Sequence, residues 1–134
     1  MAAPTTTPAY AQVPIIGIAT LTSPSAITSR ANITGTTGLV QLTATSTNGT
    51  PVSSIVIKSK ETSVALCVGV WMYNGTTSFL FDEILVTAIT GSTTVASERV
   101  VRTYEDLVVP PTYQLFISST VDNDLTAFAM GGTY

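Results

Sequence analysis

The feature that most constrains the fold of this chain is the stretch of residues 64–85, where two β-rich runs flank Asn74-Gly75. In the first run, every second residue is apolar and belongs to one face: Val64, Leu66, Val68, Val70 and Met72. Side chains of a strand alternate between two faces, so this pattern predicts a strand with a buried face. Asn-Gly is the strongest short-range hairpin signal and suits a type I′ turn, in which both central residues have positive φ. We therefore predict a β-hairpin over residues 64–85.

The rest of the chain repeats this combination of short β-rich runs and turn residues. We predict further strands at residues 15–21, 39–45, 52–58, 95–104, 113–119 and 125–130. Turn residues separate them: Asn48-Gly49, Gly91-Ser92 and Asp122-Asn123-Asp124. A parallel sheet would need crossover helices, and no segment has a sustained helical period with caps. The expected fold is therefore an all-β antiparallel β-sandwich or jelly roll of about eight strands.

Residues 1–12 are rich in Pro, Thr and Ala and show no periodicity. Pro4, Pro8 and Pro14 keep the residues before them out of the helical region. We expect an extended N-terminal arm at 1–12, either disordered or laid along a neighbour, followed by a single β-sandwich domain at 13–134. Residues 1–8 lack the basic and apolar regions of a secretory signal, so we expect no export by that route.

Charged residues make up only 10% of the chain, well below the usual quarter, whereas Ser and Thr exceed a quarter. Such a surface favours assembly over a highly soluble monomer. The five basic residues are Arg30, Lys58, Lys60, Arg99 and Arg102, and the net charge is −3. Binding to phosphate depends on clustered Lys and Arg, so we expect no nucleic-acid partner. We expect no membrane partner either, because no unbroken apolar stretch of about 20 residues is present.

The chain contains no histidine, which removes the usual base for a Ser, Thr or Cys nucleophile. The adjacent carboxylates of Asp82 and Glu83 point to opposite faces of a strand, and a hydrolase built on carboxylates paired across the fold is a minor alternative. Asp122-Asn123-Asp124 lacks the Gly and Glu of a calcium loop and is interpreted as a turn. Cys67, the only cysteine, is interpreted as a small buried apolar residue. We expect no enzyme, no catalytic residue, no metal and no cofactor.

Trp71 and Tyr73 lie on one face of the predicted strand, close to the hairpin tip. Aromatic rings in such a place can stack on sugar rings, or they can pack against the opposite sheet or a subunit. We favour packing, because Trp is mostly buried in proteins.

Several short motifs in residues 64–134 resemble small β-sandwich virion proteins of tailed bacteriophages. They are Val70-Trp71-Met72-Tyr73-Asn74-Gly75, the Val-Pro-Pro-Thr-Tyr-Gln-Leu run at 109–115, and the closing Ala-Phe-Ala-Met-Gly-Gly-Thr-Tyr at 127–134. Members of this group often end in Gly-Gly-x-aromatic. The resemblance implies capsid decoration or another structural role in the virion, and it brings no catalytic residues. Residues 1–63 carry no such resemblance.

The first hypothesis is a non-enzymatic decoration or cement protein on the outer surface of the capsid of a tailed bacteriophage. Its partners would be the major capsid protein or other virion proteins, together with further copies of itself, a trimer being favoured. The residues expected on its interaction surface are Pro4, Pro8, Tyr10, Trp71, Tyr73 and Tyr134. The alternative is a receptor- or carbohydrate-binding module of a phage fibre or adhesin. An RNA-virus coat protein is disfavoured, because packaging RNA needs more than five basic residues.

Overall fold

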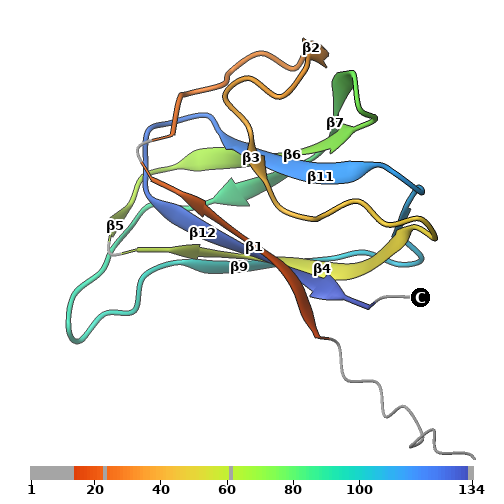
Figure 1. Cartoon of the computed structure of the whole chain (residues 1–134). Coiled ribbons are helices and arrows are strands. Elements are labelled where there is room, and N and C mark those ends of the chain that lie inside the picture. Colours follow the sequence, from red (N-terminus) through yellow and green to blue (C-terminus); the bar gives the residue numbers. More distant parts are fainter. Residues whose placement is uncertain (1–13, 23, 61, 133–134) are drawn as a thin grey trace, which may run out of the picture.

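The computed structural model describes residues 14–22, 24–60 and 62–132, which form two facing antiparallel sheets and no helix (Figure 1). This confirms the expected all-β antiparallel fold. The strands of the described residues are β1 (Ile15–Leu21), β2 (Ile33–Thr34), β3 (Val40–Gln41), β4 (Thr50–Ser59), β5 (Thr62–Ser63), β6 (Leu66–Tyr73), β7 (Thr77–Val86), β8 (Ile89–Thr90), β9 (Arg99–Thr103), β10 (Val108–Val109), β11 (Gln114–Ser119) and β12 (Leu125–Gly131).

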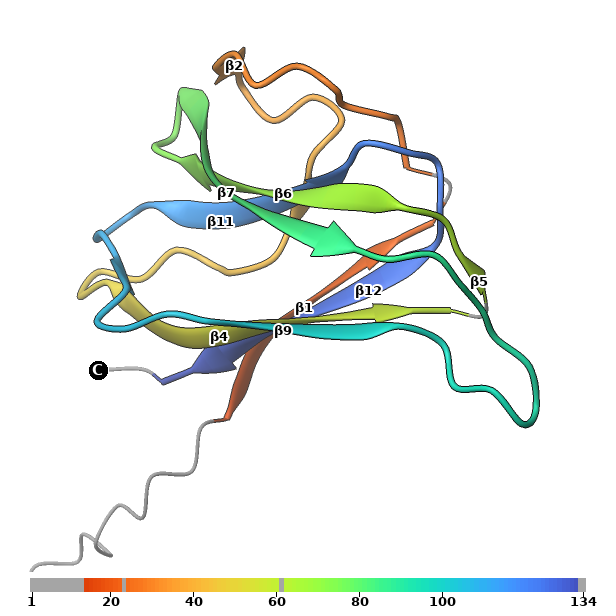
Figure 2. The ribbon, with the colours of Figure 1, turned by 180° about the vertical axis from the view of Figure 1, so that it is seen from behind.

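The two sheets have the strand order of a jelly roll. The lower sheet of Figure 1 has the order β1-β12-β4, and β9 and β10 pair with successive parts of the free edge of β4. The upper sheet has the order β2-β7-β6-β11-β3. If the eight principal strands (β1, β3, β4, β6, β7, β9, β11 and β12) are counted in chain order, the sheets read 1-8-3-6 and 2-7-4-5. A short ladder pairs β5 with β8, and Figure 2 shows from behind that β5 lies at one end of the sandwich.

The core lies between the two sheets and is formed by alternate residues of the long strands. From the lower sheet, the inward residues include Leu21, Ile55, Ile57, Leu125 and Ala127, all 2% exposed or less. From the upper sheet they include Leu66, Val68, Val70, Ile84, Val86, Leu115 and Ile117. Each of these strands therefore buries the side chains of every second residue, as the period of two requires. In the predicted apolar face of the hairpin, only Val64 is exposed, because it precedes β6.

The predicted hairpin is present, as β6 and β7, but its turn is not of type I′. Gly75 has a φ of 98°, whereas Asn74 is not among the described residues with positive φ. The side chain of Asn74 organises the turn, because its Oδ1 accepts hydrogen bonds from the backbone N–H of Thr76 (2.9 Å) and Thr77 (2.8 Å). The expectation of a type I′ turn is therefore wrong, and Asn74 acts through an Asx-type side-chain bond.

Two predicted strands are shorter than their patterns suggest. The run at 39–45 pairs only at Val40–Gln41, because the N–H groups of Leu42 and Thr43 both donate to the Leu115 carbonyl and end the regular ladder. The run at 95–104 forms β9 only from Arg99, and the residues before it belong to a loop. β9, which carries Arg99 and Arg102, lies at an edge of its sheet.

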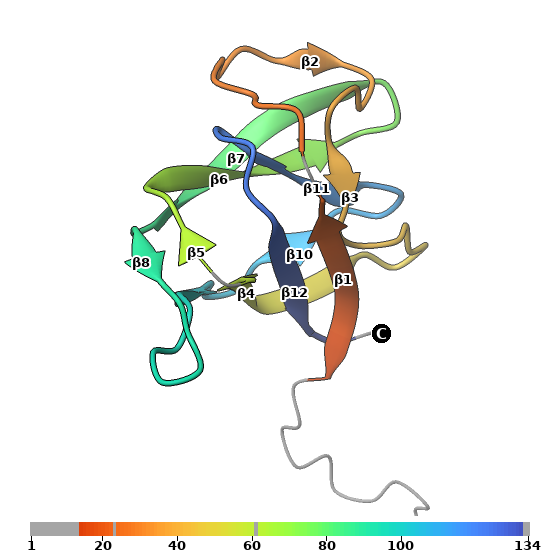
Figure 3. The ribbon, with the colours of Figure 1, turned by 90° about the vertical axis from the view of Figure 1, so that its left-hand side faces the viewer.

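Gly17 sets how closely the sheets approach on one side of the sandwich. Figure 3 shows β1 of the lower sheet close to β3 of the upper sheet. A Cβ atom at Gly17 would lie 1.9 Å from the carbonyl oxygen of Leu42, just after β3. Only glycine leaves room for this contact between two backbones.

We predict that Gly17→Ala lowers the free energy of unfolding by at least the ~1–3 kcal/mol typical of overpacking, because neither backbone can move without disturbing its sheet. Urea unfolding followed by circular dichroism measures this. The control is Gly132→Ala, whose new methyl group would find its nearest neighbour, the Pro51 Cγ, at 3.8 Å. Equal midpoints for the two variants would contradict the packing argument.

Candidate interaction surfaces

The outer face of the upper sheet is covered by the chain's own segment between β1 and β3, which passes over it in Figure 1. Ala26 forms a bridge to Ser119, and the N–H of Ile27 donates to the Ser119 carbonyl at 2.9 Å. Further along, the Nε of Arg30 lies 2.6 Å from Oε1 of Glu83 on β7. This segment, residues 24–39, covers part of the upper face, while Leu85 of β7 on the same face remains 60% exposed.

Trp71 is buried beneath this covering segment. Its side chain is 1% exposed, and its Nε1 donates a hydrogen bond of 2.8 Å to the Oγ of Ser118 on β11. The small cavity beside it is also lined by Ile27 and Arg30 of the segment. The packing interpretation of Trp71 is thus confirmed, although the indole packs under residues 24–39 rather than against the opposite sheet.

The remaining residues predicted for an interaction surface do not gather around Trp71. Tyr73 is half-buried and meets Phe116 edge-on, with ring centroids 5.5 Å apart. Pro4, Pro8, Tyr10 and Tyr134 lie outside the described residues. Trp71 is not open to a sugar ring, so a carbohydrate-binding module would need another site, and that alternative remains a prediction. Cys67 lies on the same outer face and is half-buried, so its expected full burial is wrong.

The outer face of the lower sheet, in contrast, has no described segment over it (Figures 1 and 2). It carries a row of apolar side chains. The strand register places Ile18 beside Phe128, Phe128 beside Val56, and Val56 beside Val101. We call these four residues the apolar row. Ile18 is 58% exposed and Val101 45%, and the other two are half-buried. The row crosses the entire sheet, from one edge strand to the other.

Two further rows flank the apolar row on the same face. On one side lie Thr20, Thr126, Lys58 and Arg99, and on the other Ile15, Met130, Ser54 and Thr103. Only the first of these rows carries charge, and both of its charges are positive. Period-two alternation places polar residues on the solvent side of a sandwich strand, so an apolar row there departs from the rule. Sequence reasoning missed this surface because the pairing of β1, β12, β4 and β9 is not visible in the order of the residues.

A polar cluster joins the two sheets at the edge opposite Gly17. Asp82 of β7 accepts a 2.9 Å hydrogen bond from the Tyr104 hydroxyl, and its Oδ2 lies 3.4 Å from the Arg102 Nε. Arg102 also donates to the Glu83 carbonyl at 2.8 Å. As predicted, Asp82 and Glu83 point to opposite faces, Asp82 toward the lower sheet and Glu83 toward Arg30. Burial, followed by the hydrogen bond to Asp82, raises the pKa of Tyr104 above its usual value.

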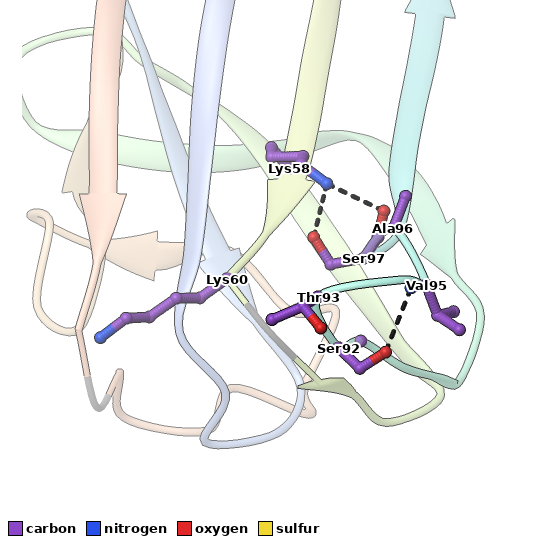
Figure 4. Close-up of a pocket in the computed structure, with 8 residues that line it drawn as sticks. Lys58, Lys60, Ser92, Thr93, Val95, Ala96 and Ser97 are labelled. Atoms are coloured by element: carbon purple, nitrogen blue, oxygen red, sulfur yellow. Dashed lines mark hydrogen bonds between the residues drawn. The ribbon is translucent and has the colours of Figure 1, made fainter.

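A shallow depression of about 710 Å³ lies beside the loop that precedes β9. Figure 4 shows its hydroxyl-bearing residues Ser92, Thr93 and Ser97, with Lys58 among them and Lys60 extending away. The Lys58 amino group donates to the carbonyl (2.8 Å) and the hydroxyl (2.5 Å) of Ser97. Lys58 is therefore held by the loop itself, and the depression has no aromatic ring on which a sugar could stack.

The described residues contain no cluster of three or more His, Cys, Asp or Glu side chains that could hold a metal ion. The loop Asp122-Asn123-Asp124 is bound instead to the residues that follow β4. Asn123 Nδ2 donates a hydrogen bond to the Thr62 carbonyl, and the Lys60 N–H donates one to the Asp124 carbonyl. In the part of the chain that the structure describes, there is no apolar helix of membrane-spanning length. Comparison of the chain with protein-family models, curated proteins and solved structures finds no match.

We predict that Ser118→Ala lowers the free energy of unfolding by ~1–3 kcal/mol, because it leaves the buried indole N–H of Trp71 without its acceptor. Trp71 is the only tryptophan, so urea unfolding can be followed by its fluorescence. Ser25→Ala, at an exposed serine, is the matched control. An unchanged midpoint for Ser118→Ala would show that the bond contributes nothing.

We predict that the folded state loses stability as the pH rises above the ordinary tyrosine pKa, about 10. The pKa of Tyr104 is raised on folding, so above that pH the unfolded chain releases the phenol proton while the folded chain retains it. The stabilisation that Tyr104 contributes is fully present below the pKa of this residue in the unfolded chain. It is lost as the pH rises toward the pKa of Tyr104 in the folded chain. Thermal unfolding of the wild type and Tyr104→Phe from neutral to alkaline pH isolates it, since the other tyrosines are shared. Parallel curves of melting temperature against pH for the wild type and Tyr104→Phe would refute this prediction.

Proposed function

We propose that this chain is a non-enzymatic structural protein of a virion, and specifically a decoration protein on the outer surface of a tailed-bacteriophage capsid. The observation that carries the proposal is the apolar row, which no described segment covers, on a jelly-roll sandwich that is poor in charged residues. Contiguous apolar residues on a soluble domain mark sites of protein–protein contact. The motif resemblance of residues 64–134 directs that contact toward a virion.

The physical account rests on a rigid domain that presents surfaces to neighbours. Two sheets locked by one core keep the outer faces in a fixed shape, so that binding costs little ordering of the chain. The net charge of −3 disfavours a position next to packaged nucleic acid and favours the outside of the particle. Many identical contacts on a capsid lattice would convert weak individual binding into firm attachment.

The N-terminal arm, residues 1–12, supplies the second part of the proposal. It carries no charged side chain and contains Pro4, Pro8 and Tyr10. An extended segment of this kind can add to a sheet edge of the major capsid protein through main-chain hydrogen bonds, which require no special side chains. In this arrangement the arm attaches the subunit to the shell, and the sandwich remains outside.

Quantitative mass spectrometry of purified particles that carry this chain tests the proposal. We predict a copy number comparable to that of the major capsid protein, because decoration follows the capsid lattice. Deletion of residues 1–12 should reduce occupancy of particles stripped of the protein and then resupplied with it, while circular dichroism of the sandwich stays unchanged. A copy number typical of a tail or vertex would reject decoration, and full occupancy without the arm would reject arm attachment.

A further inference from the structure

The lower sheet has an outer face that no described segment covers, and its exposed apolar side chains favour a partner there. The apolar row (Ile18, Phe128, Val56 and Val101) extends across all four strand positions of the sheet. On the upper sheet, residues 24–39 cover the part of the equivalent face around Trp71 and Ser119. We propose that the lower face is a homotypic interface, on which a second copy of this chain docks sheet to sheet about a two-fold axis. The homotypic interface rests on the proposed function, because it names a partner for the same face on which that function was based.

The size of the face fits a pair that is weak in solution. With strands about 4.8 Å apart and about 3.3 Å per residue, four strands over some seven residues cover roughly 20 Å by 23 Å. Two such faces bury about 900 Å² in total, below the range of stable complexes and within that of weak, transient ones. A second sandwich offers a flat partner surface of the same extent, and two sheets pack well face to face at about 10 Å.

Charge decides how the second copy is oriented. The row that holds Lys58 and Arg99 lies on one side of the apolar row, and the uncharged Ser54 and Thr103 lie on the other. A two-fold axis parallel to the strands would place the basic row over the basic row of the partner. An axis along the apolar row places Lys58 and Arg99 over Ser54 and Thr103 of the partner and avoids that repulsion. The second orientation also lays each apolar residue against its own counterpart.

This geometry predicts pairs rather than the trimer expected from the sequence. When the same surface patch of two subunits is in contact, the interface is isologous, and it is complete with two copies. A trimer would need two different complementary surfaces on each subunit. Along a capsid lattice, such pairs would link neighbouring decoration subunits.

Sedimentation velocity of the full chain over a concentration series tests the interface. We expect a reversible dimer with a Kd of the order of 10–100 µM, consistent with the area. Ile18→Glu and Val101→Glu should each weaken it by about 100-fold or more, since each glutamate would face its own copy across the axis. Leu85→Glu is the matched control, because Leu85 is 60% exposed, against 58% for Ile18, but lies on the upper sheet.

A cross-linking experiment tests the axis separately. In a Cys67→Ser background, Val56→Cys should be joined by a short bis-maleimide at dimer concentrations, because Val56 would face its counterpart. Leu85→Cys in the same background should remain uncross-linked. Circular dichroism of every variant confirms that the exposed substitutions leave the fold intact.

Each outcome decides the inference. A wild type that stays monomeric at all concentrations, or a dimer that survives both Ile18→Glu and Val101→Glu, overturns it. If the wild type is monomeric while Ile18→Glu loses its place on particles, the lower face binds a capsid protein instead, and the proposed function stands without the second copy. If the wild type forms a dimer that Ile18→Glu and Val101→Glu weaken, but the protein does not bind to particles, the interface is supported and the decoration role is rejected.

Discussion

The burial of one face of each sheet against the other is the constraint on which the rest of this structure depends. Apolar burial stabilises at roughly 25 cal/mol per Å², so the inward residues of the long strands, such as Ile57 and Val68, supply the main driving force. Because side chains alternate, burying every second residue also decides which residues must point outward. The edges follow from the same geometry: Gly17 permits close approach on one side, and the Arg102–Asp82–Tyr104 cluster joins the sheets on the other.

The two outer faces satisfy this constraint in different ways. Above the upper sheet, residues 24–39 lie over Trp71, whose indole N–H is paired with Ser118. The burial of Trp71 on that face is therefore completed within the chain. The lower sheet exposes Ile18 and Val101 and has no such covering segment among the described residues.

Local patterns predicted the parts of the fold that local physics controls. Short β-rich runs bounded by turn residues located β1, β4, β6, β7 and β12, and Asn74-Gly75 located the hairpin, because β propensity and turn chemistry depend on neighbours in sequence. The turn type and the early end of β3 were missed, since the first depends on a side-chain bond of Asn74 and the second on a carbonyl of β11. Of the expected surface residues, Trp71 is buried, because the segment that covers it lies some forty residues earlier in the chain.

The sequence by itself determined that this protein is an antiparallel all-β domain with little charge and no histidine, because strand periodicity and side-chain chemistry can be read without knowing contacts. Only the tertiary structure decided that Ile18, Phe128, Val56 and Val101 form one row. These residues are distant in sequence, and each looks unremarkable in its own strand. Strand order and register bring them together, and both are set by the packing of the whole core, which no single segment encodes.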